Sequence, residues 1–157
     1  MSLLGLGAMP VEPDRDRPSL PATNPIAFAY ADVTIDPAGT PLAAYQLEFT
    51  ADANRVKLVG IEGGDAAAFK DPPYYDPAAL NHNRVILAAF STGADLPKQS
   101  FRAARLHLQI TGLETPKCQV KLIAAAAADG SKIPAATASV TPPQSAATTV
   151  SPEGATR

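Results

Sequence analysis

The amino-acid sequence predicts an all-β protein, an antiparallel two-sheet β-sandwich of the jelly-roll type with seven to nine strands. Short segments in which apolar and polar residues alternate recur along the chain, and this period of two is typical of half-buried strands. The 157 residues include 16 prolines and 10 glycines, which suit a fold with many turns. The length is that of one domain, and a chain of this size buries roughly two thirds of its unfolded surface in a single core.

The first strand is expected within residues 26–35. We predict a β-bulge near Ala31 and Asp32, because the large apolar residues change from one face of the strand to the other at this point. The residues before the change are Ile26, Phe28 and Tyr30, and those after it are Val33 and Ile35. The segment 36–41 contains proline and glycine and predicts a turn into the next strand.

The clearest pair of strands lies between residues 41 and 62, where two alternating runs flank a short polar turn at residues 52–54. Residues 84–92 are apolar on both faces, which is typical of a central strand or of one whose outer face is covered. The core residues predicted from these and the later runs are Tyr45, Leu47, Phe49, Val56, Leu58, Leu87, Leu106, Leu108, Val120 and Leu122.

Three further strands are expected within residues 102–110, 118–125 and 135–141, the last preceded by a turn at Asp129-Gly130. The folded domain is therefore expected to span residues 26–141. Residues 1–25 predict an extended Pro-rich N-terminal arm, and residues 142–157 a flexible Pro/Ser/Thr/Ala-rich tail, because neither has the apolar content to fold alone.

The first ten residues lack the basic start of a signal peptide, and their apolar run is shorter than the roughly 20 residues that span a bilayer. They fit either the remnant of a processed leader or anchor, or an ordinary N-terminus.

The order of the motifs resembles that of cohesin domains. The run Ala44-Tyr-Gln-Leu-Glu-Phe49, then Asp52, then a strand ending at Gly60 resembles the strand, turn and strand of that family. Later matches follow in the same order: the strand from Arg84 to Phe90, Leu96-Pro97 before the strand from Ala103 to Ile110, and Asp129-Gly130 before Ser139-Val140. The resemblance covers about residues 26–141 and implies a β-sandwich of the cohesin or carbohydrate-binding-module type.

Two features depart from the cohesin pattern. The family begins with a strand that has no counterpart before Ile26, and the insert at residues 63–83 is particular to this chain. Recognition of dockerin, the usual cohesin partner, is therefore not implied. A likeness at the level of the fold does not by itself fix the function.

The resemblance implies a non-enzymatic module that binds another protein, as an accessory subunit or structural protein of an extracytoplasmic assembly, whether periplasmic, extracellular or at the cell surface. Cohesins use the outer face of one sheet for recognition. The residues here that match this face, together with two tyrosines of the insert, are Gln46, Glu48, Ile86, Phe90, Lys121, Ile123, Tyr74 and Tyr75.

The predicted face contains three large apolar residues, Ile86, Phe90 and Ile123, opposite residues that face the core. They form an exposed patch, typical of an interaction site, unless the insert folds over them and makes them core. Tyr74 and Tyr75 lie between prolines and supply rigid contact area for recognition; alternatively, one of them caps the end of the core.

Carbohydrate binding is the alternative function, since carbohydrate-binding modules share this sandwich. The chain has no tryptophan, and the aromatic residues expected at the surface are Phe69, Tyr74, Tyr75 and Phe90. The sequence therefore gives less support to a linear platform of aromatic rings that binds polysaccharide than to a protein interface.

The sequence gives little support to other classes of function. His82 and His107 have no neighbouring arrangement that would activate a nucleophile, so no catalytic residue is predicted. The single Cys118 predicts a small buried strand residue, and no metal or cofactor site is expected. The spacing of Asp65, Asp71 and Asp76 does not match a calcium loop. A net charge of −2 does not favour a nucleic-acid partner.

Overall fold

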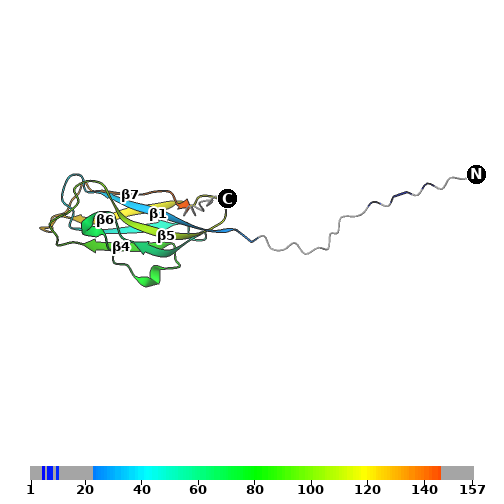
Figure 1. Ribbon diagram of the computed structural model, residues 1–157, viewed down its shortest axis with the longest axis horizontal. Coiled ribbons are helices and arrows are strands. Elements are labelled where there is room, and N and C mark those ends of the chain that lie inside the picture. The colour runs from blue at the N-terminus through cyan, green and yellow to red at the C-terminus, as the bar shows by residue number, and fades with distance from the viewer. Residues whose placement is uncertain (1–4, 6, 9, 11–22, 146–157) are drawn as a thin grey trace, which may run out of the picture.

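The computed structural model describes residues 5, 7, 8, 10 and 23–145, which contain eight β-strands and two short 3₁₀-helices (Figure 1). The strands are β1 (Ile26–Asp36), β2 (Ala44–Ala51), β3 (Val56–Glu62), β4 (Arg84–Phe90), β5 (Phe101–Thr111), β6 (Cys118–Ala126), β7 (Thr137–Val140) and β8 (Gln144–Ser145). The helices are η1 (Ala67–Phe69) and η2 (Pro77–Ala79), and both lie between β3 and β4.

The strands form two antiparallel sheets that stack as layers (Figure 1). The larger sheet has the order β3-β5-β1-β7, with β8 also paired to β1, and the smaller has the order β4-β2-β6. The predicted two-sheet all-β sandwich and its number of strands are thus confirmed.

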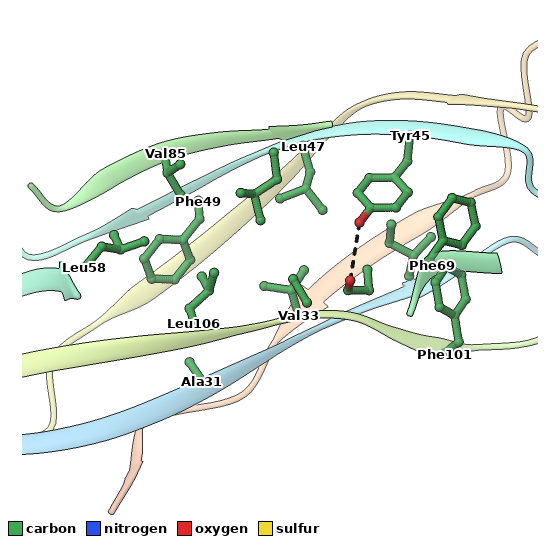
Figure 2. Close-up of a cluster of buried hydrophobic side chains, with 14 of the residues drawn as sticks. Ala31, Val33, Tyr45, Leu47, Phe49, Leu58, Phe69, Val85, Phe101 and Leu106 are labelled. Atoms are coloured by element: carbon green, nitrogen blue, oxygen red, sulfur yellow. Dashed lines mark hydrogen bonds between the residues drawn. The ribbon is translucent and has the colours of Figure 1, made fainter. Parts of the chain in front are cut away.

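The core lies between the two sheets, where alternate residues of both layers interdigitate (Figure 2). The Tyr45 hydroxyl donates a hydrogen bond across the core to the carbonyl oxygen of Ala103, at 3.3 Å. Of the ten predicted core residues, Tyr45, Leu47, Phe49, Val56, Leu58, Leu87, Leu106 and Leu108 are buried. Val120 and Leu122 pack against the core but are only half-buried, because β6 is an edge strand.

The apolar alternation of β1 is unbroken, so the bulge predicted near Ala31 and Asp32 is wrong. Alternate residues from Ala29 to Ile35 all face the core, while Ile26 and Phe28 are exposed. The irregularity lies instead in β5, where Ala103 is the extra residue between the partners of two neighbouring β1 residues. Small alanines on the core face of β1 give a weak hydrophobic signal, which explains the error.

Strand pairing extends beyond the predicted domain boundary at residue 141. In β8, Ser145 pairs with Ala29 and Gln144 pairs with Tyr30. The Tyr30 hydroxyl donates a hydrogen bond to Oε1 of Gln144, at 2.9 Å. The start of the predicted tail thus belongs to the sandwich. Residues 146–157 of that tail, and most of the predicted arm 1–25, lie outside the described residues.

Candidate functional site

The insert at residues 63–83 begins with a close contact to β5 that only glycine permits. A Cβ atom on Gly64 would lie 2.1 Å from the carbonyl oxygen of Arg102, far inside van der Waals contact. Beside it, the Asp65 N–H donates to the Arg102 carbonyl at 3.1 Å, and the Arg102 N–H donates to Asp65 Oδ1 at 2.9 Å. The start of the insert is therefore pinned to the bulged part of β5.

Phe69, in η1, extends from this anchor into the sandwich core (Figure 2). Its ring meets that of Tyr45 edge-on at 5.3 Å and stacks on that of Phe101 at 5.5 Å between centroids. The side chain is 3 % exposed, so the expectation that Phe69 reaches the surface is wrong. The glycine contact brings the chain close enough to β5 for the ring to enter the core.

Tyr74 attaches the middle of the insert to β4. Its N–H donates to the carbonyl of Ala88 at 2.7 Å, and the Ala88 N–H donates to the Tyr74 carbonyl at 3.0 Å. The Tyr74 side chain is 70 % exposed, and its ring stacks on that of Phe90 at 6.2 Å with an interplanar angle of 11°. Tyr75, by contrast, is half-buried against the core, as expected if one tyrosine of the pair caps it.

A third attachment joins the end of the insert to β3. The Asn81 N–H donates to the Leu58 carbonyl at 2.7 Å, and the Leu58 N–H donates to the His82 carbonyl at 2.8 Å. The insert is thus held at its start, middle and end, although it projects as a loop from the β4 edge (Figure 1). A surface ordered before binding loses less conformational entropy on association.

The outer face of the β4-β2-β6 sheet carries most of the predicted binding residues. In the strand register, Glu48 lies between Ile86 and Lys121, and Gln46 lies between Ala88 and Ala124. The side chains of Glu48 and Arg84 form an ion pair on this face.

The three large apolar residues of this face are uncovered: Ile86 is 39 % exposed, Phe90 64 % and Ile123 46 %. The insert therefore lies beside the patch and contacts it through the Tyr74 ring, and does not bury it. Ile123 is the extra residue of a bulge in β6, between the partners of Gln46 and Leu47. We refer to Ile86, Phe90, Ile123 and Tyr74 as the apolar patch.

Two hollows adjoin Tyr74. The face hollow, of about 280 Å³, lies over the sheet, with Tyr74 and Phe90 on its rim and small residues beneath. The edge groove, of about 670 Å³, runs between the insert and β4. Its lining residues include Tyr74, Tyr75, Asp76, His82, Asn83, Arg84 and Ile86. Tyr75 therefore belongs to this groove and not to the sheet face.

The opposite face of the molecule, on the larger sheet, carries a charged cluster that was not predicted. The Arg105 guanidinium donates two hydrogen bonds to the Asp32 carboxylate, at 2.7 and 2.9 Å, and lies 4.1 Å from the centre of the Tyr30 ring. These hydrogen bonds hold the pKa of Asp32 below its usual value. His107 Nε2 lies 2.8 Å from Glu62 Oε1.

This cluster joins side chains from β1, β3 and β5, which are far apart in sequence. The only sequence signal for it was that these residues occupy alternate positions on the outer face of their strands. Arg105 and Asp32 neutralise each other's charge, as in a solvated sheet face.

The other side chains considered as candidate sites have structural roles. Asp76 Oδ1 accepts the Ala78 N–H at 2.9 Å and so caps η2. Cys118 is half-buried, and burial together with the charge of Asp52 raises the pKa of its thiol to about 11. Among the described residues, no three His, Cys, Asp or Glu side chains are grouped so as to hold a metal ion.

In the part of the chain that the structure describes, no helix has the length and apolar character needed to cross a membrane. Comparison with family models, curated proteins and solved structures gives no match to this chain.

Proposed function

We propose that this protein is a non-enzymatic module that binds another protein through the outer face of its β4-β2-β6 sheet. The observation that carries the proposal is the apolar patch: Ile86, Phe90, Ile123 and Tyr74 are exposed, and the rings of Tyr74 and Phe90 stack on each other. Exposed apolar patches usually mark interaction sites in soluble proteins.

The surroundings of the patch have the composition of a protein interface. Such interfaces combine an apolar and aromatic centre with a polar rim. Here the Glu48–Arg84 ion pair and Lys121 adjoin the apolar residues, and Tyr74 is held in place by its backbone bonds to Ala88. The patch is therefore arranged before a partner arrives, which lowers the entropic cost of binding.

The resemblance to cohesins supports a role as an accessory or structural subunit of an extracytoplasmic assembly.

The substitution Phe90→Glu tests the proposal. We expect the variant to keep its melting temperature within a few degrees, because the side chain is already 64 % exposed. It should lose the protein partner that the unchanged chain retains from extracts of its native source, because binding would bury an unpaired charge.

Phe28→Glu is the matched control, since Phe28 is 62 % exposed but lies on the other sheet. It should retain the partner. A stable Phe90→Glu variant that still binds normally would remove this face from consideration, and a large loss of stability would show that Phe90 is effectively core.

Carbohydrate binding is the second candidate, favoured by the stacked and exposed rings of Tyr74 and Phe90 beside a groove lined by Asp76, Asn83 and Arg84. Aromatic rings next to hydrogen-bonding side chains are a common composition for small-ligand sites. A glycan array probed with the same protein sample discriminates the two functions. Tight and selective retention of a glycan, with no protein partner recovered, would favour carbohydrate binding.

A further inference from the structure

The edge of β4 presents backbone hydrogen-bonding groups to the edge groove. Residues 83 and 91 face β2, since the Asn83 carbonyl accepts the Ala51 N–H at 2.9 Å and the Ser91 N–H donates to the Ala43 carbonyl at 2.8 Å. Ala88 faces the other way, toward Tyr74. Because alternate residues of a strand direct their backbone groups to the same side, those of Ile86 also point away from β2.

The outward N–H and C=O of Ile86 have no hydrogen-bond partner among the described residues. They lie along the edge groove, whose lining includes Ile86 together with Val85 and Arg84. The opposite wall is the insert, which after its pairing with Ala88 bonds to the backbone of the sandwich again at Asn81 and His82. The groove is therefore a slot with a strand edge on one side and a fixed loop on the other.

We propose that the edge groove receives an extended segment of the protein partner, which pairs with β4 at Ile86 as an additional strand. This inference rests on the proposed function and specifies how the partner is held. Strand addition to an exposed edge draws its affinity from main-chain hydrogen bonds and its specificity from alternate side chains. The groove volume of about 670 Å³ is within the usual range for ligand sites.

The position of Tyr74 fixes the direction in which the added segment extends. Tyr74 already occupies the pairing position at Ala88, so the segment extends from Ile86 toward Arg84. The Arg84 side chain is 58 % exposed at that end of β4. Because Arg84 is already paired with Glu48, the chemistry of the segment follows from the groove lining of Tyr75, Val85 and Ile86, which favours an extended, mainly apolar segment. Tyr74 also belongs to the apolar patch, so one partner can contact the sheet face and the groove together.

The test selects peptides from a displayed library of random peptides, using the full chain as the target. Selected peptides are then compared on two variants at one position. Ile86→Val keeps both backbone groups and shortens the side chain, so its affinity is the reference that includes a side-chain change at this position. Ile86→Pro also removes the outward N–H, a change that edge strands tolerate, and it should bind at least about tenfold more weakly than Ile86→Val.

A second measurement needs no substitution. In the unchanged chain, the selected peptide should slow hydrogen exchange of the Ile86 amide at least about tenfold, as expected for a new ladder bond. The inference is overturned by peptides that bind Ile86→Pro as well as the unchanged chain, by unchanged exchange at Ile86, or by a library that gives no peptide dependent on this position.

The two proposals can fail separately. A protein partner that is lost with Phe90→Glu but fully retained by Ile86→Pro would leave the sheet face as the interface and refute strand addition. A partner retained by both variants would refute both proposals.

Discussion

The substitution Phe69→Ala tests whether the insert is a rigid part of the sandwich. Phe69 is 3 % exposed and contacts the rings of Tyr45 and Phe101, so its removal opens a cavity where the insert meets the core. Truncation of a buried phenylalanine to alanine costs about 3–5 kcal/mol of unfolding free energy. Each of the two aromatic contacts adds about 0.5–1.5 kcal/mol to the stabilisation that comes from burying the ring surface. The cost of Phe69→Ala should therefore lie well inside the range given for a buried phenylalanine.

The loss should lower the melting temperature by about 10–20 °C in a domain of this size. Urea denaturation monitored by tyrosine fluorescence gives the free energy directly. Because Phe69 positions the insert, the Ala88 amide, which donates to the Tyr74 carbonyl, should also exchange faster in the variant.

Phe28→Ala serves as the matched control, since that side chain is 62 % exposed and should cost no more than about 1 kcal/mol. If Phe69→Ala cost as little as the control, and the Ala88 amide exchanged at its original rate, the docking of the insert would have no energetic role and the reasoning would be refuted.

Two further predictions concern titratable groups. Asp32→Asn should cost about 1 kcal/mol at pH 7, after allowance for solvent screening of the partly exposed pair with Arg105. Because Arg105 lowers the pKa of Asp32, the carboxylate stabilises the fold above its unfolded pKa of about 4, and this contribution is lost as the pH falls through the folded value. Urea titrations at pH 7, 5 and 3 should therefore show the difference between variant and parent shrinking; a constant difference would contradict the assignment. Cys118, with its pKa raised to about 11, should react with iodoacetamide at pH 8 at least about 100-fold more slowly in the folded chain than in urea. Mass spectrometry of timed samples measures both rates, and equal rates would show that the thiol is not protected.

Local alternation was sufficient to predict the sandwich, because strands such as β2 and β5 place one apolar face against the core. Alternation did not reveal that Ala29 and Ala31 face the core, because alanine side chains are small and only weakly hydrophobic. It also failed at β8, where a two-residue pairing with β1 depends on a distant strand and leaves no pattern of its own.

The candidate site likewise combines features that the sequence predicts with features that depend on contacts between distant parts of the chain. The alternation of β4 places Ile86 and Phe90 on its outer face, but it left open whether the insert covers them, and their exposure is seen only in the structure. The burial of Phe69 does not follow from alternation, because it requires the contact between Gly64 and β5, and that contact forms only in three dimensions. The pairing of Tyr74 with Ala88 likewise depends on how the insert closes against the sandwich.

The pairing of β8 with β1 has a mechanical consequence. Ser145 lies opposite Ala29 near the start of β1, so the chain enters β1 and leaves β8 at the same end of the sandwich. A tension applied between the start of β1 and the end of β8 would separate β8 from β1 one hydrogen bond at a time. The force would then act on β7, which pairs with the later residues of β1. Strands loaded in sequence yield at lower force than strands sheared along their length. If the module is tethered through both ends, its terminal strands would therefore open under load before the β4-β2-β6 sheet and its binding face are disturbed.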